Sequence, residues 1–204
     1  MPGQPQRLVV LASGNGSNLQ VVIDACASRA IDVRVAAVFS DRPSAMALER
    51  ARAAGIPAIA LPVTAGQSRR DYDTALADAV SAHEPDLIML LGWMRLLSGS
   101  FLSRFPGTVV NLHPALPGTF PGTHAIERAL AAYQAGAIPH TGVMTHFVPD
   151  EGVDSGPVIR VETVPIYAGD DLEDLETRVH AAEHRIVLET LESLCDPQTR
   201  TIKE

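Results

Sequence analysis

Short runs of apolar residues recur along the chain and alternate with segments in which apolar side chains repeat every three or four positions. A short continuous apolar run is typical of a strand buried on both faces, and the longer period is typical of an amphipathic helix. The predicted strands cover residues 7–12, 31–39, 56–61, 86–91, 109–113, 141–148 and 158–164. The predicted helices cover a segment that begins at residue 19, then 44–54, 68–83, a short segment ending near 105, 123–135 and 170–194. This alternation predicts an α/β fold: a mostly parallel sheet with helices on both faces and a long C-terminal helix.

A glycine-containing loop, residues 13–18, lies between the first predicted strand and the first predicted helix. Such a loop presents free backbone N–H groups and the positive end of a helix dipole, which together favour phosphate. The loop also partly matches the G-x-G-x-x-G dinucleotide fingerprint, but Leu19 occupies the third glycine position. A nicotinamide site, in which Asp41 would hold a ribose, and a purely structural turn are the alternatives. We favour a site for a phosphate monoester.

The run that ends in Asn111-Leu112-His113-Pro114 carries the clearest candidate chemistry. Side chains two apart in a strand lie on the same face, so Asn111 and His113 are expected to point together. An amide donor beside a group that exchanges protons near neutral pH suits chemistry at a carbonyl. A structural histidine satisfied by hydrogen bonds is the alternative for the pair alone.

Two further segments are expected near this pair. Residues 93–97 follow a predicted strand, and ligands of parallel sheets bind beyond the carboxyl ends of the strands. Trp93 and Met94 there are either core residues or the floor of a pocket for an aromatic ligand. Asp154 lies in a glycine-containing loop that could approach His113, although spacing alone leaves that contact open.

The late helix contains the pattern His180-Ala-Ala-Glu183-His184, which matches the H-x-x-E-H motif of some zinc proteases. An amphipathic surface helix is the favoured interpretation, and we expect no metal. His180 and Glu183 share one helix face that could look into the cleft.

Composition narrows the class of partner. Of 204 residues, 46% are hydrophobic and 20% charged, and the formal net charge is −8. That charge disfavours nucleic acid and anionic membranes, which are bound mainly through clustered lysines and arginines, and leaves small molecules as expected partners.

Cys26 and Cys195 are the two cysteines, so we expect no disulfide framework and a cytoplasmic location. We expect a single domain over residues 1–204, with flexible ends at 1–6 and 196–204; the sequence assigns no oligomeric state.

Four motifs together resemble a known family. They are Ser13-Gly-Asn-Gly-Ser-Asn-Leu19, Gly92-Trp-Met-Arg-Leu-Leu97, Asn111-Leu-His-Pro114 and His146-Phe-Val…Asp154-Ser-Gly-Pro-Val158. In order and content they resemble the folate-dependent formyltransferases, and the glycine loop resembles the phosphoribosylglycinamide formyltransferase branch. The resemblance implies a Rossmann-like domain that transfers the formyl group of 10-formyltetrahydrofolate, as a cosubstrate, to the amine of 5'-phosphoribosylglycinamide in purine biosynthesis.

The resemblance also implies roles for individual residues. The catalytic residues would be Asn111, His113 and Asp154. The phosphoribosylglycinamide site would contain Gly16, Ser17, Asn18, His180 and Glu183. The folate site would contain Arg69, Met94, Arg95, Leu96, Leu97, Asn111, Asp150 and Val153.

The mechanism implied is attack by the amine on the formyl carbon. Asn111 and protonated His113 would stabilise the resulting oxyanion, and Asp154 would keep His113 charged and help to move the amine proton. Three departures from the family pattern are visible: a loop before Asp154 that is one residue longer, Met144 in place of a small polar residue, and His180 at a variable place. A formyltetrahydrofolate hydrolase, or transfer to another amine, is the first alternative. A protein that binds a nicotinamide dinucleotide is the distant one.

Overall fold

The computed structural model describes residues 4–195, which contain seven strands and six helices. The strands are β1 (Gln6–Leu11), β2 (Val33–Ser40), β3 (Ala58–Ala60), β4 (Leu87–Leu90), β5 (Val109–His113), β6 (His140–Phe147) and β7 (Val158–Pro165). The helices are α1 (Ser17–Ala27), α2 (Met46–Ala53), α3 (Arg69–Ser81), α4 (Gly99–Leu102), α5 (Ala125–Gln134) and α6 (Leu172–Cys195).

All seven strands form one sheet in the order β3-β2-β1-β4-β5-β6-β7. The first five strands in this order are parallel, whereas β6 pairs antiparallel with β5 and β7 pairs antiparallel with β6. The direction of winding reverses between β1 and β4, which is where ligands bind in sheets of this kind. The predicted α/β, mostly parallel, Rossmann-like architecture is confirmed.

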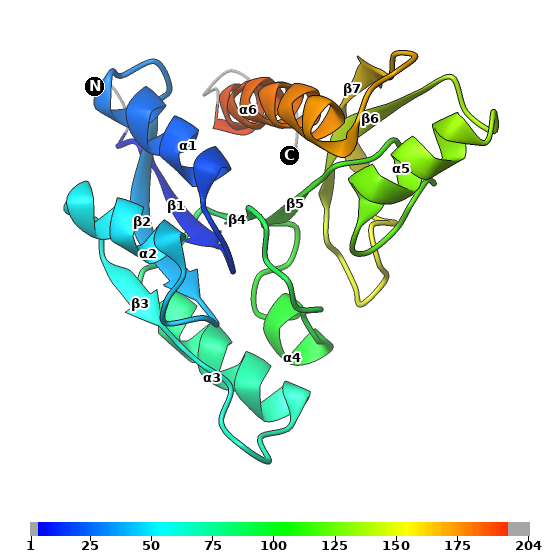
Figure 1. Cartoon of the computed structure of the whole chain (residues 1–204). Coiled ribbons are helices and arrows are strands. Elements are labelled where there is room, and N and C mark those ends of the chain that lie inside the picture. The colour runs from blue at the N-terminus through cyan, green and yellow to red at the C-terminus, as the bar shows by residue number, and fades with distance from the viewer. Residues whose placement is uncertain (1–3, 196–204) are drawn as a thin grey trace.

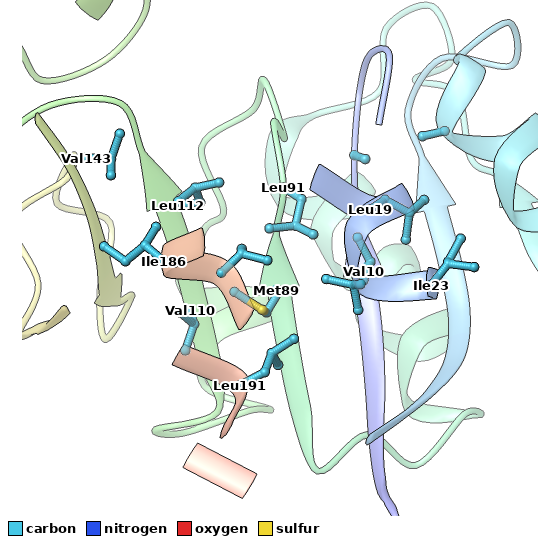
Figure 2. Packing of buried hydrophobic residues seen from close by; sticks show 14 of the residues in the cluster. Val10, Leu19, Ile23, Met89, Leu91, Val110, Leu112, Val143, Ile186 and Leu191 are labelled. Atoms are coloured by element: carbon cyan, nitrogen blue, oxygen red, sulfur yellow. The ribbon is translucent and has the colours of Figure 1, made fainter. Parts of the chain in front are cut away.

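Helices cover both faces of the sheet. Helices α1, α2, α5 and α6 pack on one face, and α3 and α4 pack on the other (Figure 1). In β1, Leu8 and Val10 belong to the first core and Val9 and Leu11 to the second. Burial on both faces explains why the parallel strands read as continuous apolar runs. Figure 2 shows the first core, in which side chains of α1 and α6 pack on the central strands; the labelled residues include Val10, Met89, Val110, Leu19, Ile186 and Leu191.

Several boundaries differ from the sequence prediction. Strand β3 contains only Ala58–Ala60, because it is an edge strand that pairs with β2 alone. Helix α2 begins at Met46 rather than residue 44, since the extended Ala45 precedes it. Gln6, expected in the N-terminal end, is the first residue of β1. Residues 4 and 5 precede β1 outside regular secondary structure, and the other positions expected in flexible ends, 1–3 and 196–204, lie outside the described residues. None of the helices within residues 4–195 is long and apolar enough to cross a lipid bilayer.

Candidate active site

Four side chains meet at the end of β5, and we call Asn111, His113, His146 and Asp154 the polar cluster. The Asn111 Nδ2 donates to Asp154 Oδ1 at 3.0 Å and lies 3.2 Å from His146 Nε2. His113 Nδ1 lies 3.3 Å from the other carboxylate oxygen of Asp154. The cluster is deeply placed, since His113 is 3% and His146 2% exposed. The structure therefore brings together all three of the residues expected to be catalytic.

The backbone geometry around Asp154 explains how a loop residue reaches a strand 41 positions earlier. Asp154 adopts a left-handed conformation with φ of 49°, which is uncommon outside glycine. Gly156 is required for a different reason: a Cβ there would lie 1.9 Å from the Phe147 carbonyl oxygen. The loop can therefore turn back tightly against the end of β6 and present the Asp154 carboxylate to β5.

A second loop completes the contacts of the polar cluster. His113 Nε2 lies 3.1 Å from the Phe120 carbonyl oxygen, and the Gly122 N–H donates to Asp154 Oδ2 at 2.7 Å. His146 Nδ1 lies 2.8 Å from the Phe147 carbonyl oxygen, a contact that a proton on Nδ1 would make a hydrogen bond. The proline- and glycine-rich loop after β5 thus packs directly over the reactive side chains.

Burial and polar contacts shift the pKa values of the cluster in opposite directions. Burial lowers the pKa of His113 below its ordinary 6.5, although the Asp154 charge and the Phe120 carbonyl act in the opposite direction. Burial raises the pKa of Asp154, but the contacts with His146, the Gly122 N–H and the His113 charge outweigh it and leave that pKa below its ordinary value. Burial thus opposes the charged form of His113, while the ionised Asp154 beside it favours that form.

A neutral His113 leaves one of its two contacts incomplete. Its ring nitrogens both face oxygen acceptors, Asp154 on one side and Phe120 on the other. A neutral imidazole carries one ring proton, whereas an imidazolium carries two. Gaining a proton would therefore give His113 a donor for each oxygen, so the surroundings are arranged to receive a proton.

The glycine loop has the geometry expected of an anion site. Gly16 precedes α1 with a left-handed φ of 75°, and no side chain caps the helix. The first turn of α1, which begins at Ser17, contains no acidic residue that would compete with an anion for the free N–H groups.

Helix α6 adds a carboxyl group beside this loop. Asn18 Nδ2 donates to Glu183 Oε2 at 3.1 Å, across 165 positions of sequence. Burial raises the pKa of Glu183, which is 7% exposed, while the bond from Asn18 and the His180 charge act to lower it. His180 itself is exposed. Asn18 and Glu183, both expected at the phosphoribosylglycinamide site, are thus in contact, whereas His180 acts on Glu183 through charge rather than through a hydrogen bond.

The residues expected at the folate site divide into two groups. Met94 and Leu96 are 55% and 50% exposed and Val153 is 40% exposed, which is unusual for large apolar side chains. They follow β4 or lie one residue before Asp154, so apolar surface stands next to the polar cluster. Such surface suits a flat aromatic ligand.

The other expected folate residues are engaged within the protein. Arg69 Nη2 donates to the Leu97 carbonyl oxygen at 3.1 Å and to Glu151 Oε2 at 2.6 Å. Arg95 instead stacks on the Tyr72 ring at 4.7 Å. The Asp150 carboxylate accepts from the Gly152 N–H at 2.8 Å, within its own loop.

An open pocket of about 530 Å³ lies beside Arg69. Its lining residues are Arg69, Arg70, Ser98, Gly99, Ser100, Ser103 and Glu151. It does not include the polar cluster, and Glu151 joins the two regions because it lies in the loop that carries Asp154.

Comparisons with known proteins agree with this geometry. The sequence profile described as "Formyl transferase" matches residues 6–191. The chain belongs to the formyl transferase family. It is 45% identical to phosphoribosylglycinamide formyltransferase of Escherichia coli (strain K12), over 88% of this chain and 82% of that protein. It is 43% identical to the enzyme of the same name from Schizosaccharomyces pombe, over 92% of this chain and 96% of that protein.

Solved structures show the same similarity. Glycinamide ribonucleotide transformylase 1 from Symbiobacterium toebii superposes with a TM-score of 0.89 at 42% identity, covering 95% of this chain and 89% of that one. Phosphoribosylglycinamide formyltransferase from Bacillus halodurans also gives 0.89, at 35% identity, covering 98% of this chain and all (100%) of that one.

Sequence reasoning assigned no role to His146, Phe120 or Gly122 in this formyl transferase domain. His146 stands opposite Asn111 in the antiparallel pairing of β5 with β6, so only the strand register brings it to the cluster. Phe120 and Gly122 act through backbone atoms, which no residue type reveals. The polar position that the family pattern suggests at residue 144 is filled by Met144, which is 1% exposed and opposite His113.

Two further sequence patterns concern Trp93 and the H-x-x-E-H segment. Trp93 is 7% exposed and belongs to the core beneath α3, so it does not floor a ligand pocket. Within the part of the chain that the structure describes, no group of three or more histidine, cysteine, aspartate or glutamate side chains is arranged to hold a metal ion.

Proposed function

We propose that this chain transfers the formyl group of 10-formyltetrahydrofolate to the primary amine of 5'-phosphoribosylglycinamide. The observation that carries the proposal is the polar cluster, in which Asn111 and His113 both contact Asp154. Membership of the formyl transferase family and the names of the relatives support it. Both substrates are small molecules, and we place the activity in a reducing cytoplasm.

Two regions would hold the phosphoribosylglycinamide. The N–H groups at Gly16, Ser17 and Asn18 would receive the phosphate, because they open a helix without a side-chain cap. The buried Glu183, with Asn18 as its partner, would bind hydroxyl groups of the ribose. His180 would line the exposed rim of this site.

The folate would lie against the exposed apolar surface of Met94, Leu96 and Val153. The Arg95 backbone and the Leu97 N–H would make polar contacts with its ring, since the Leu97 carbonyl oxygen already accepts from Arg69. Arg69 now donates a hydrogen bond to Glu151 and would instead bind a carboxylate of the ligand. Asp150 would lie at the edge of this surface.

The chemical step needs an oxyanion donor and a proton carrier. The amine nitrogen attacks the formyl carbon, and the negative charge develops on the formyl oxygen. One Asn111 N–H would turn from His146 to that oxygen, and such a donor typically contributes about 3 kcal/mol to lowering the barrier. Neutral His113 would take the amine proton, and the resulting imidazolium would be stabilised by Asp154.

The second half of the reaction reverses the proton transfer. The bond between the formyl carbon and the folate nitrogen breaks as the carbonyl reforms. His113 would give its proton to that nitrogen and return to its neutral resting form. The proposed steps use the side chains of the polar cluster alone.

The test is an assay of the purified protein with both substrates. Formation of the deformylated folate is followed by absorbance, with and without phosphoribosylglycinamide. The proposal predicts product only when the amine is present. Product without the amine would instead indicate a hydrolase, and tight NADH binding that phosphoribosylglycinamide does not weaken would indicate a nicotinamide protein.

A further inference from the structure

Helix α2 packs against the glycine loop closely enough to shape it. A Cβ at Gly16 would lie 2.8 Å from both the Cα and the Cβ of Ala47. The Ala47 N–H donates to the Gly14 carbonyl oxygen at 3.1 Å. The loop and the first turn of α2 are therefore in direct backbone contact.

One turn later, Arg50 of α2 reaches the same loop with its whole guanidinium group. Nε donates to the Asn15 carbonyl oxygen at 2.9 Å and Nη2 to Asn15 Oδ1 at 3.0 Å. Nη1 donates to Gln20 Oε1 at 3.3 Å, on the first turn of α1. Arg50 thus joins the residue before Gly16 to the helix that follows it.

The charge of Arg50 is not balanced by a carboxylate. Its three partners are neutral oxygens, and no ion pair within residues 4–195 includes it. Arg52, on the same helix, shows the usual arrangement, since it is exposed and paired with Glu49. A positive charge left unpaired beside a helix N-terminus favours an anion there.

We infer that Arg50 is a positioning residue for the substrate phosphate: it holds the glycine loop in the shape that presents the N–H groups at 16–18. This inference rests on the proposed function for the identity of the anion. A planar fork with donors at fixed angles can orient Asn15 through its backbone and side chain together, which an ammonium group cannot do. Arg50 acts through its hydrogen bonds to Asn15 and Gln20 and takes no part in the proposed proton transfer.

The kinetic test compares Arg50→Gln and Arg50→Lys with Arg52→Gln as the matched control. Arg50→Gln should raise KM for phosphoribosylglycinamide about tenfold while kcat and KM for the folate stay within about twofold, because uniform binding is lost and not transition-state stabilisation. Arg50→Lys should stay close to Arg50→Gln, and Arg52→Gln should match the parent. An unchanged KM in Arg50→Gln, or full recovery in Arg50→Lys, would overturn the positioning role.

A binding measurement separates this inference from the proposed function. Inorganic phosphate should raise the melting temperature of the parent and of Arg52→Gln, and should raise that of Arg50→Gln and Arg50→Lys much less. If the parent transfers no formyl group but this contrast is seen, the anion site stands and the proposed reaction falls. If the reaction is confirmed but phosphate stabilises all four proteins equally, the inference about Arg50 is wrong.

Discussion

The two ends of the candidate site are built in opposite ways. At the glycine-loop end, residues 14–18 are consecutive, and the groups that would bind the phosphate belong to the backbone of α1 and its preceding loop. At the other end, the polar cluster takes side chains from β5, β6 and the loop before β7, together with backbone atoms of a fourth segment. Consecutive residues supply the binding groups of the first end, with Arg50 of α2 holding their loop, whereas long-range packing assembles the second.

The electrostatics of the two ends differ in the same way. The polar cluster pairs its charge internally, since the Asp154 carboxylate is bound by Asn111 and Gly122 and faces two histidines. The glycine-loop end keeps unpaired positive character in the helix dipole and Arg50. We conclude that one end is prepared for an ionic ligand and the other for the movement of a proton. Changes at the first should affect binding, and changes at the second should affect turnover.

The largest expected effect is on turnover at the polar cluster. Asn111→Ala, His113→Ala and Asp154→Asn should each lower kcat about 100-fold or more, because each removes an oxyanion donor or a part of the proton path. KM for phosphoribosylglycinamide should change by less than about threefold, since the phosphate site is untouched. Steady-state kinetics provides the measurement, with exposed Ser155→Ala as the control. Near-normal kcat in any one variant would remove that residue from the proposed mechanism.

The next effect concerns the stability of the glycine-loop end. Gly16→Ala should lower the free energy of unfolding by about 2 kcal/mol, because the new Cβ meets Ala47 and alanine is disfavoured at positive φ. Gly14→Ala is the matched control, since nothing lies within 4 Å of a Cβ there. Urea unfolding of both variants measures the difference. Equal loss of stability in the two would mean that α2 does not constrain the loop at Gly16.

A smaller effect is expected at the apolar surface beside the cluster. Met94→Ala and Leu96→Ala should each raise KM for 10-formyltetrahydrofolate about fivefold, because each removes apolar contact area from the ligand. KM for phosphoribosylglycinamide and the melting temperature should stay close to the parent, since both side chains are half exposed. Val161→Ala, an exposed residue on β7, serves as the control. If KM for phosphoribosylglycinamide rose and KM for 10-formyltetrahydrofolate did not, the folate would not bind at this surface.

The smallest expected effect is a shift in the pH dependence of kcat/KM. The log of kcat/KM should fall at acid pH as His113 gains a proton. The fall should come below pH 6.5, the ordinary pKa of a histidine, because burial lowers the pKa of His113. The Asp154 charge raises the pKa of His113, so Asp154→Asn should move the residual acid limb further toward low pH. His180→Ala, at the exposed rim, should leave the limb in place. An acid limb that moves to higher pH in Asp154→Asn would contradict the role of His113 as the proton acceptor.

Much of the fold follows from local patterns in the sequence. The central parallel strands read as apolar runs because both of their faces are covered, and the Gly16 to Leu19 segment identifies the start of α1. Strand β7 was recognisable from its β-branched residues, although it is largely exposed and contains Arg160 and Glu162. The pair Asn111 and His113 was recognisable from a local pattern too: two residues apart on one strand, they share a face whatever the rest of the chain does.

Tertiary structure decided the remainder of the site. The contact of Asp154 with His113 depends on a left-handed backbone and on Gly156, and the place of His146 depends on the register of β6 against β5. The resting charge of His113 depends on how deeply the loop containing Phe120 and Gly122 covers it, because desolvation outweighs the neighbouring carboxylate. Sequence patterns report which conformation a segment prefers. Which segments pack together, and how much water they exclude, is settled only when all of them are in place.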